Sequence, residues 1–251
     1  MYIHETNVHN LDAPSVVVPI LIDLIKPASI LDVGCGIGTW LSVFNKEGVK
    51  DYFGIDGDYV NKEMLSGFID PDHFAPVDLS GPFDLKRKFD LLICLEVAEH
   101  LPPETAEQFI KSLVIHADRI VFSAAVPGQG GQDHLNEQWP EYWVTLFARH
   151  NYLCYDIIRP LIWDKPEVNW WYQQNMFVFS KTPPADAVRS ANYISFIHPR
   201  HFNQKADRIT EMDMQLRQRS AELEKWENGK QGVRKHWRSF LRSIKRKYFV
   251  F

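Results

Sequence analysis

Short apolar runs alternate with amphipathic segments along the first 180 residues. Phe89–Leu95 is almost continuously apolar, which is typical of a strand buried on both faces of a sheet. The predicted strands are Ser29–Val33, Asp51–Ile55, His73–Val77, Phe89–Leu95, Arg119–Ala125, Tyr152–Arg159 and Met176–Ser180. The predicted helices between them are Thr39–Glu47, Tyr59–Ser66, Glu104–His116 and Glu137–His150. Strands separated by helices predict an α/β fold with a doubly wound, mostly parallel, seven-stranded sheet.

This alternation ends near residue 180. Lys181–Ala187 contains two prolines and reads as a linker. Ala206–Asn228 is a polar segment rich in Glu, Gln and Arg, and its pattern predicts a helix. We therefore predict a first domain over residues 1–180, a linker over residues 181–205 and a helical, basic C-terminal extension over residues 206–251.

The composition is that of a globular protein. Of the 251 residues, 45% are apolar and 13% aromatic, which excludes a disordered or collagen-like chain. No apolar run reaches the ~18 residues of a membrane-spanning helix, and Met1–Asn10 lacks the pattern of a signal peptide. The widely spaced Cys35, Cys94 and Cys154 favour buried thiols over disulfides, so we expect a cytoplasmic protein.

The net charge of −4 hides a basic tail. Eight of the 28 basic residues lie in Lys230–Phe251, which has no acidic residue, so residues 1–229 carry 20 basic and 32 acidic residues, a net of −12. Trp237, Phe240 and Ile244 lie at helical spacing among these charges, as in a helix that binds an anionic membrane surface. We therefore expect peripheral association of residues 230–251 with the inner membrane surface. Docking on the same chain or on a second subunit of a homodimer, RNA binding and a disordered end are the alternatives.

A glycine-rich turn, Gly-Cys-Gly-Ile-Gly, follows the first predicted strand. Gly34, Gly36 and Gly38 permit a ligand to approach the backbone closely and the next helix to pack tightly. Asp56 ends the second strand, where its carboxylate can accept hydrogen bonds from both hydroxyls of a ribose. The glycine spacing differs from the GxGxxG of dinucleotide binders, which disfavours a nicotinamide cofactor. A turn that serves only packing is the other alternative.

These residues resemble the class I S-adenosylmethionine-dependent methyltransferases, by motif over residues 28–125 and by element order through residue 180. The resemblance implies a Rossmann-like methyltransferase fold with S-adenosylmethionine as the cofactor, its methionine part lying on the glycine turn. It places Asp32 near the cofactor's amino group, Asp56 at the ribose and Asp78 at the adenine. The full set of expected cofactor-binding residues is Asp32, Gly34, Cys35, Gly36, Gly38, Asp56, Gly57, Asp78, Leu79 and Leu95.

Two carboxylates and an imidazole follow the fourth predicted strand. If residues 96–100 form a helical turn, Glu96, Glu99 and His100 stand at positions i, i+3 and i+4 and share one face. Such a set suits a divalent cation, and without a cation the neighbouring carboxylates would raise each other's pKa. A metal-free site with His100 or His134 as general base, and a purely structural role, are the alternatives.

This segment resembles the Glu-x-x-Glu-His motif of metal-dependent O-methyltransferases that act on small-RNA 3′ ends and on catechol-like quinone precursors. In the RNA enzymes a further His, from the loop after the fifth strand, completes the metal site, and His134 is the matching position in a shorter loop. The resemblance implies a Mg, Mn or Fe ion held by Glu96, Glu99, His100 and His134, and Glu99, His100 and His134 are also the expected catalytic residues. A metal that binds two neighbouring hydroxyls lowers the pKa of the one that attacks.

Amide and aromatic side chains near this loop are candidate substrate contacts. Asn136 and Glu137 can hydrogen-bond to acceptor hydroxyls, and Trp139 lies close by in the sequence. Trp170 belongs to a polar and aromatic segment, Asn169–Asn175, whose ring faces and amides suit a sugar. Core packing is the alternative for the aromatic residues, and a place in the first helical turn is the alternative for Glu137.

The expected function is O-methylation of a saccharide or sugar-linked intermediate, because the chain resembles methyltransferases encoded with bacterial surface polysaccharide assembly. RNA 2′-O-methylation and methylation of a small catechol-like molecule are alternative activities, and a non-catalytic scaffold is an alternative of another class. The acidic body disfavours nucleic acid, since phosphate backbones bind to basic surfaces. The glycine turn and Asp56 disfavour a scaffold.

Overall fold

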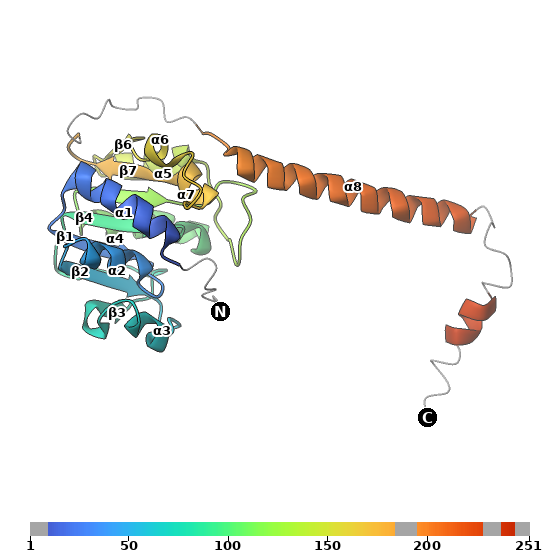
Figure 1. The fold of residues 1–251 in the computed structure, drawn as a ribbon, viewed down its shortest axis with the longest axis horizontal. Helices are drawn as coiled ribbons and strands as arrows, with labels where there is room; N and C mark the ends of the chain where they lie inside the picture. Colours follow the sequence, from blue (N-terminus) through green and yellow to red (C-terminus); the bar gives the residue numbers. More distant parts are fainter. Residues whose placement is uncertain (1–9, 184–194, 228–236, 244–251) are drawn as a thin grey trace. The chain divides into compact units, whose positions relative to one another are not determined.

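The computed structural model describes residues 10–183, 195–227 and 237–243. The chain forms two compact units, Met1–His198 and Pro199–Phe251. The first contains a sheet with its covering helices, and the second contains the long helix α8, Pro199–Glu227 (Figure 1). Because α8 begins at Pro199 and not at Ala206, the last part of the expected linker is helical.

Most of the predicted membrane-binding segment, residues 230–251, lies outside the described residues. Of this segment, residues 237–243 are described and helical, with Trp237, Phe240 and Leu241 exposed. In the described parts of the chain, no helix combines the length and the apolar character that crossing a membrane requires.

Seven strands form one sheet in the order β3-β2-β1-β4-β5-β7-β6. Their bounds are β1 Ser29–Val33, β2 Asp51–Asp56, β3 Phe74–Pro76, β4 Leu91–Leu95, β5 Arg119–Ser123, β6 Leu153–Tyr155 and β7 Phe177–Ser180. All neighbouring strands pair in parallel except β7, which is antiparallel to both β5 and β6. The predicted doubly wound, mostly parallel sheet is confirmed. The strand order reverses between β1 and β4, and ligands bind outside the carboxyl ends of the strands at such a point.

Helices cover both faces of the sheet, which is why the strands are almost continuously apolar. Ile30 packs in the cluster that includes side chains of α1 (Asp12–Ile25) and α2 (Thr39–Lys46). Its neighbour Leu31 packs in the other cluster, with side chains of α4 (Ala106–Val114) and α5 (Pro140–Ala148). Both strand residues are fully buried, and burial of such a side chain contributes about 1.5–3 kcal/mol.

The four helices predicted between the strands are shorter in the structure than in the sequence pattern. Helix α5 begins at Pro140, a residue that suits the first helical turn, so Glu137 lies in the preceding loop. Helix α3 covers only Lys62–Ser66, because the Asn61 side chain accepts hydrogen bonds from two backbone amides and caps the helix there. The remaining short elements are η1 Pro71–His73, η2 Ala98–His100, η3 Pro103–Thr105, α6 Arg159–Ile162 and α7 Trp170–Asn175.

Helix α1 has no counterpart in the sequence prediction. Its segment is rich in β-branched residues and contains Pro19 in the helix interior, and both features disfavour a helix locally. It is nevertheless helical because one side, with Val17 and Leu21 fully buried, packs in the core. The predicted strand Tyr152–Arg159 is also wrong at its end, since β6 ends at Tyr155.

Candidate active site

The glycine turn after β1 has a backbone that other residues rarely adopt. Gly34 and Gly38 have φ angles of 82° and 85°, in the left-handed region. A Cβ atom on Gly34 would lie 2.2 Å from Cγ2 of Val97, which follows β4. The backbone amide of Gly34 also donates a hydrogen bond to the carbonyl of Ile55 in β2, at 2.8 Å. The turn is therefore packed tightly between the ends of β2 and β4, at the point where the strand order reverses.

Asp56, at the end of β2, holds this turn in place. Its Oδ2 atom accepts a hydrogen bond from the amide of Gly36 at 2.7 Å. Its Oδ1 atom accepts from the amide of Gly57 at 2.7 Å and from the hydroxyl of Tyr59 at 2.6 Å. A ribose hydroxyl that donated to Oδ1 would replace the hydroxyl of Tyr59 there. Sequence reasoning did not identify Tyr59 as part of this site.

Asp32, in β1, is a buried carboxyl group with an unfilled acceptor atom. The residue is 3% exposed, and its Oδ2 atom has no hydrogen-bond partner among the described residues. Burial, and then the negative charge of Asp56, raise the pKa of Asp32 well above its usual range. A cationic group bound here would pair with Oδ2 and stabilise the charged carboxylate. The residue thus fits the amino group that the sequence prediction places beside it.

The other predicted cofactor-binding residues differ in their surroundings. Asp78 is exposed, and its Oδ1 atom accepts hydrogen bonds from the hydroxyl and the amide of Ser80, which lower its pKa. Leu79 is buried, and Leu95, the last residue of β4, is partly buried. A Cβ atom on Gly54 of β2 would lie 2.7 Å from Sγ of Cys35, so the Cys35 side chain packs against β2. All three cysteines are buried and free, as predicted.

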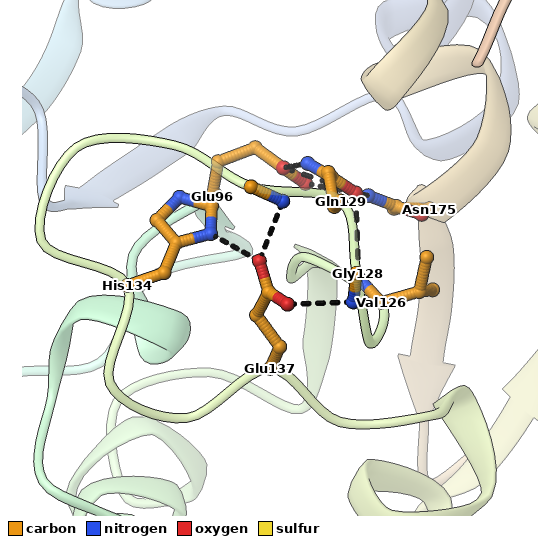
Figure 2. Close-up of polar contacts among 8 residues, drawn as sticks. Glu96, Val126, Gly128, Gln129, His134, Glu137 and Asn175 are labelled. Atoms are coloured by element: carbon orange, nitrogen blue, oxygen red, sulfur yellow. Dashed lines mark hydrogen bonds and ion pairs between the residues drawn. The ribbon is translucent and has the colours of Figure 1, made fainter. Parts of the chain in front are cut away.

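Glu96 does not share a helical face with the rest of its motif, and that prediction is wrong. Its φ angle is 55°, and the helical turn η2 begins only at Ala98. The amide of Glu96 still donates to the carbonyl of Ser123, as a continuation of β4 along β5 would. Its carboxylate accepts hydrogen bonds from Nε2 of Gln129 at 2.8 Å and Nδ2 of Asn175 at 3.2 Å (Figure 2). Glu96 therefore belongs to a network of side-chain amides.

Glu99, His100 and His134 come together beyond the end of β4. One carboxylate oxygen and one nitrogen from each imidazole all lie within 4.8 Å of one another. The two imidazole rings meet edge to face, with their centroids 4.8 Å apart. The loop that carries His134 is fixed to this turn, because the amides of Leu135 and Asn136 donate to the carbonyl of Glu99 at 2.8 and 2.9 Å. Three of the four predicted metal ligands thus form one cluster.

The electrostatics of this cluster fit a cation. Glu99 is fully buried, and neither of its carboxylate oxygens has a hydrogen-bond partner among the described residues. Burial, and then the negative charge of Glu96, raise the pKa of Glu99 well above its usual range. Burial and the neighbouring His134 lower the pKa of His100, so its imidazole is neutral at pH 7. One carboxylate and two imidazoles are a donor set that divalent transition metals accept, and a bound cation would stabilise the ionised Glu99.

Glu137 organises the loop that carries His134. Its Oε2 atom accepts a hydrogen bond from the amide of Gly128 and its Oε1 atom one from the amide of Gly130, both at 2.7 Å. Nδ1 of His134 donates to Oε1 at 2.9 Å (Figure 2). Burial raises the pKa of Glu137, but the hydrogen bonds from His134, Gly130 and Gly128 outweigh burial and lower it. This contact places the proton of His134 on Nδ1 and leaves the lone pair on Nε2.

The remaining predicted substrate contacts differ in exposure and in their hydrogen bonds. Asn136 is 2% exposed; its Oδ1 atom accepts a hydrogen bond from Gln138, while its Nδ2 atom has no partner among the described residues. Trp139 precedes α5 and is 42% exposed. Trp170 is buried at the start of α7 and packs edge to face against Trp171. Asn136 therefore keeps an unpaired donor and Trp139 an exposed ring, whereas Trp170 is engaged in packing.

Sequence reasoning missed the two amides that hold Glu96. Gln129 accepts a hydrogen bond from Nδ2 of Asn175 at 2.9 Å, although these residues are 46 positions apart. Asn175 ends α7, within the polar and aromatic segment that the sequence singled out for sugar binding. No spacing relates these residues to Glu96, because the pairing of β5 between β4 and β7 brings them together.

Comparison with known proteins places the chain among methyltransferases. The model of a methyltransferase domain family matches residues 14–156. The sugar N-methyltransferase KedS8 from Streptoalloteichus sp. ATCC 53650 superposes with a TM-score of 0.55 at 14% identity, covering 71% of this chain and 90% of its own. The magnesium protoporphyrin IX methyltransferase ChlM from Synechocystis PCC 6803, with bound SAH, gives 0.51 at 16% identity, with 72% and 90% covered. The methyltransferase domain of bacterial CtHen1-C gives 0.50 at 18% identity, with 69% and 100% covered. A search of curated protein sequences found no match. At these identities the superpositions establish the fold.

Proposed function

Because the chain belongs to the methyltransferase domain family, with S-adenosylmethionine as its cofactor, we propose that it methylates a hydroxyl oxygen with the help of a divalent metal. The observation that carries this proposal is the cluster of Glu99, His100 and His134, whose ligand atoms lie within 4.8 Å of one another. Both oxygens of the buried Glu99 carboxylate lack a partner among the described residues. A site with this chemistry serves a reaction in which an oxygen must be deprotonated.

The cofactor would lie on the glycine turn. Asp32, with its unpaired Oδ2 atom, would bind the amino group of the cofactor, and Asp56 would accept hydrogen bonds from the ribose. When bound, S-adenosylmethionine supplies an electrophilic methyl group on a positively charged sulfur. The tightly packed turn holds this end of the site rigid, and most of the rate enhancement would come from the orientation of the two reactants.

Glu99, His100 and His134 would hold the metal. When bound, the ion lowers the pKa of a coordinated hydroxyl group. The mixture of two nitrogen donors and one oxygen donor favours Mn or Fe over Mg, which prefers oxygen ligands. Glu137 would orient His134 through Nδ1, and Glu96 would add negative charge next to Glu99.

The acceptor that we propose is a saccharide or sugar-linked intermediate. Two features support it: the unpaired, buried Nδ2 donor of Asn136, which follows the His134 loop, and the exposed ring of Trp139. Such a pairing of an amide donor with an aromatic ring suits the hydroxyls and the apolar face of a sugar. KedS8, which has the same fold, is a sugar N-methyltransferase. RNA fits less well, because residues 1–229 carry a net charge of −12.

A screen of methyl acceptors tests this function. The protein would be incubated with labelled S-adenosylmethionine and with nucleotide sugars, glycans, catechols or short RNA. We expect label in a saccharide, loss of transfer with EDTA and recovery with Mn²⁺ or Fe²⁺. If only RNA or only a catechol were labelled, that class of molecule would be the acceptor and the saccharide proposal would be wrong. If methyl transfer were unchanged after complete chelation, the proposed role of a metal would be contradicted.

Replacing Glu137 with Gln is expected to weaken metal binding and activity by roughly 10–100-fold, the usual effect of losing a group that orients a metal ligand. A Gln side chain has one acceptor atom where the carboxylate has two, so at least one of the contacts to Gly128, Gly130 and His134 is lost. Gln also has no negative charge, so a hydrogen bond from Nδ1 of His134 to its amide oxygen is weaker. Cofactor affinity should not change. Calorimetric titration with Mn²⁺ and with S-adenosylmethionine measures both quantities.

Glu141→Gln is the matched control, since the Glu141 carboxylate lies in α5 and accepts a hydrogen bond from Ser195 outside the loop. We expect this variant to bind Mn²⁺ as the wild type does. Equal metal binding by the two variants would show that the negative charge of Glu137 is not needed to position His134.

A further inference from the structure

Helix α8 carries a seven-residue repeat of exposed apolar side chains. The helix has 29 residues, which corresponds to a length of about 44 Å and to about four heptads. The apolar residues in question are Phe202, Ile209, Met212, Leu216, Leu223 and Trp226. Four of them recur every seven residues, at the a positions of a heptad repeat, and the other two occupy d positions. The a residues Phe202, Ile209, Leu216 and Leu223 are 64%, 67%, 61% and 62% exposed.

We infer that α8 binds the α8 helix of a second copy of this chain in an antiparallel coiled coil. Apolar residues fill all four a positions and two of the four d positions over about four heptads, and a heptad repeat of this length is the pattern from which a coiled coil is identified. An exposed row of large apolar side chains along a helix of this length is unusual on the surface of a monomer. Apart from Met214, the large apolar side chains of α8 all lie at a or d positions, on one side of the helix.

The charged residues at the two remaining d positions select the antiparallel orientation. In a parallel pair, Lys205 and Arg219 would each face the same cation of the second copy across the core, which repels. In an antiparallel pair, a residues face d residues. Lys205 then lies opposite Leu223 of the partner subunit, and Arg219 opposite Ile209 of the partner subunit. The stems of Lys and Arg can pack on these aliphatic side chains while the charges reach water.

The residues on either side of the apolar row, at the e and g positions of the heptads, agree with the antiparallel orientation. In the same register Arg208 lies beside Glu222 of the partner subunit, and by symmetry this attractive pair occurs twice. Near the two-fold axis, Asp213 lies close to Asp213 of the partner subunit, and the two negative charges repel. Within its helix, however, Asp213 forms an ion pair with Arg217 at 2.8 Å, which offsets that repulsion.

Two methionines of α8 give a matched test of the interface. Met212 lies at a d position and is 54% exposed, whereas Met214 lies on the opposite side and is 52% exposed. We expect the full-length protein to be a dimer in light scattering coupled to gel filtration. Met212→Lys should make it a monomer, and Met214→Lys should leave it a dimer, with the same helix content by circular dichroism. A monomeric wild type, or a Met212→Lys variant that stays dimeric, would overturn the proposal.

Cross-linking tests the orientation. Gln215 lies beside its own copy only in the antiparallel arrangement, whereas Gln218 points away from the partner in either arrangement. All three native cysteines are buried, so they should not interfere under mild oxidation. We expect Gln215→Cys to form a covalent dimer and Gln218→Cys to form none. Failure of Gln215→Cys to cross-link within a dimer that Met212→Lys disrupts would overturn the antiparallel orientation.

Discussion

Replacing Glu99 with Gln is expected to lower methyl transfer by roughly 100-fold or more, because the proposed metal loses its only charged ligand in the cluster of Glu99, His100 and His134. Binding of S-adenosylmethionine should be almost unchanged, since Asp32, Asp56 and the glycine turn are untouched. Turnover at saturating cofactor, together with calorimetric titrations of Mn²⁺ and of the cofactor, measures the three quantities separately.

The Glu99→Gln variant should fold at least as well as the metal-free wild type. The raised pKa of Glu99 means that the folded chain holds this proton more tightly than the unfolded chain does. The stability that this difference contributes is present below the ordinary Glu pKa of about 4.3 and is lost as the pH rises through the raised value. The amide of Gln cannot ionise. The fall in stability of the metal-free protein as the pH rises above the ordinary Glu pKa should therefore be shallower in the variant, as thermal unfolding at a series of pH values would show.

Glu96→Gln is the matched control for this substitution. Glu96 precedes the same turn, but its carboxylate is held by Gln129 and Asn175 and lies outside the cluster. A Gln there keeps an acceptor oxygen for these amides, so we expect a clearly smaller loss of activity than with Glu99→Gln. Full activity of Glu99→Gln would contradict the proposed metal site. Equal losses in the two variants would show that both carboxylates act together.

Replacing Gly34 with Ala is expected to abolish detectable binding of S-adenosylmethionine. The new Cβ atom would lie 2.2 Å from Cγ2 of Val97, far inside van der Waals contact, so the turn or the end of β4 must shift. The φ angle of 82° adds strain of about 1–2 kcal/mol for a residue other than glycine. Because the cofactor would lie on this turn, a displacement of the backbone removes its contacts. Calorimetry with the cofactor and thermal unfolding measure the two effects.

Gly48→Ala is a control that has the backbone strain of a positive φ angle but not the steric clash of the added Cβ atom. Gly48 has a φ angle of 105° and is exposed, and no atom lies within 4 Å of the position that an added Cβ would take. This variant should lose stability but bind the cofactor normally. In the double variant Gly34→Ala/Val97→Ala the two Cγ atoms are gone and the nearest remaining atom of residue 97 lies 3.2 Å away. Partial recovery of binding is expected. Normal binding by Gly34→Ala alone would show that the cofactor does not rest on this turn.

Much of this protein is readable from local patterns. The strands and their order of appearance follow from short apolar runs, because a strand buried on both faces must be apolar at every position. The glycine turn and Asp56 follow from their places at the ends of the first two strands, and the hydrogen bond from Gly36 to Asp56 joins them in the structure. The first residue of α8 and the existence of α1 could not be predicted from these local patterns. In α1, packing of one helical side against the sheet outweighs the interior Pro19 and several β-branched residues.

What only the tertiary structure decided is which polar side chains meet. Sequence spacing alone determined that Glu99 and His100 are neighbours, and it suggested the same for Glu96. The structure keeps Glu96 close enough for its charge to raise the pKa of Glu99. It leaves Glu96 out of the ligand cluster, however, because the chain leaves β4 along β5 and the amides of Gln129 and Asn175 hold its carboxylate. It also turns Glu137 toward its own loop, where two backbone amides and His134 satisfy it. A buried carboxylate is placed by the nearest donors in space, and their positions depend on how the strands pair.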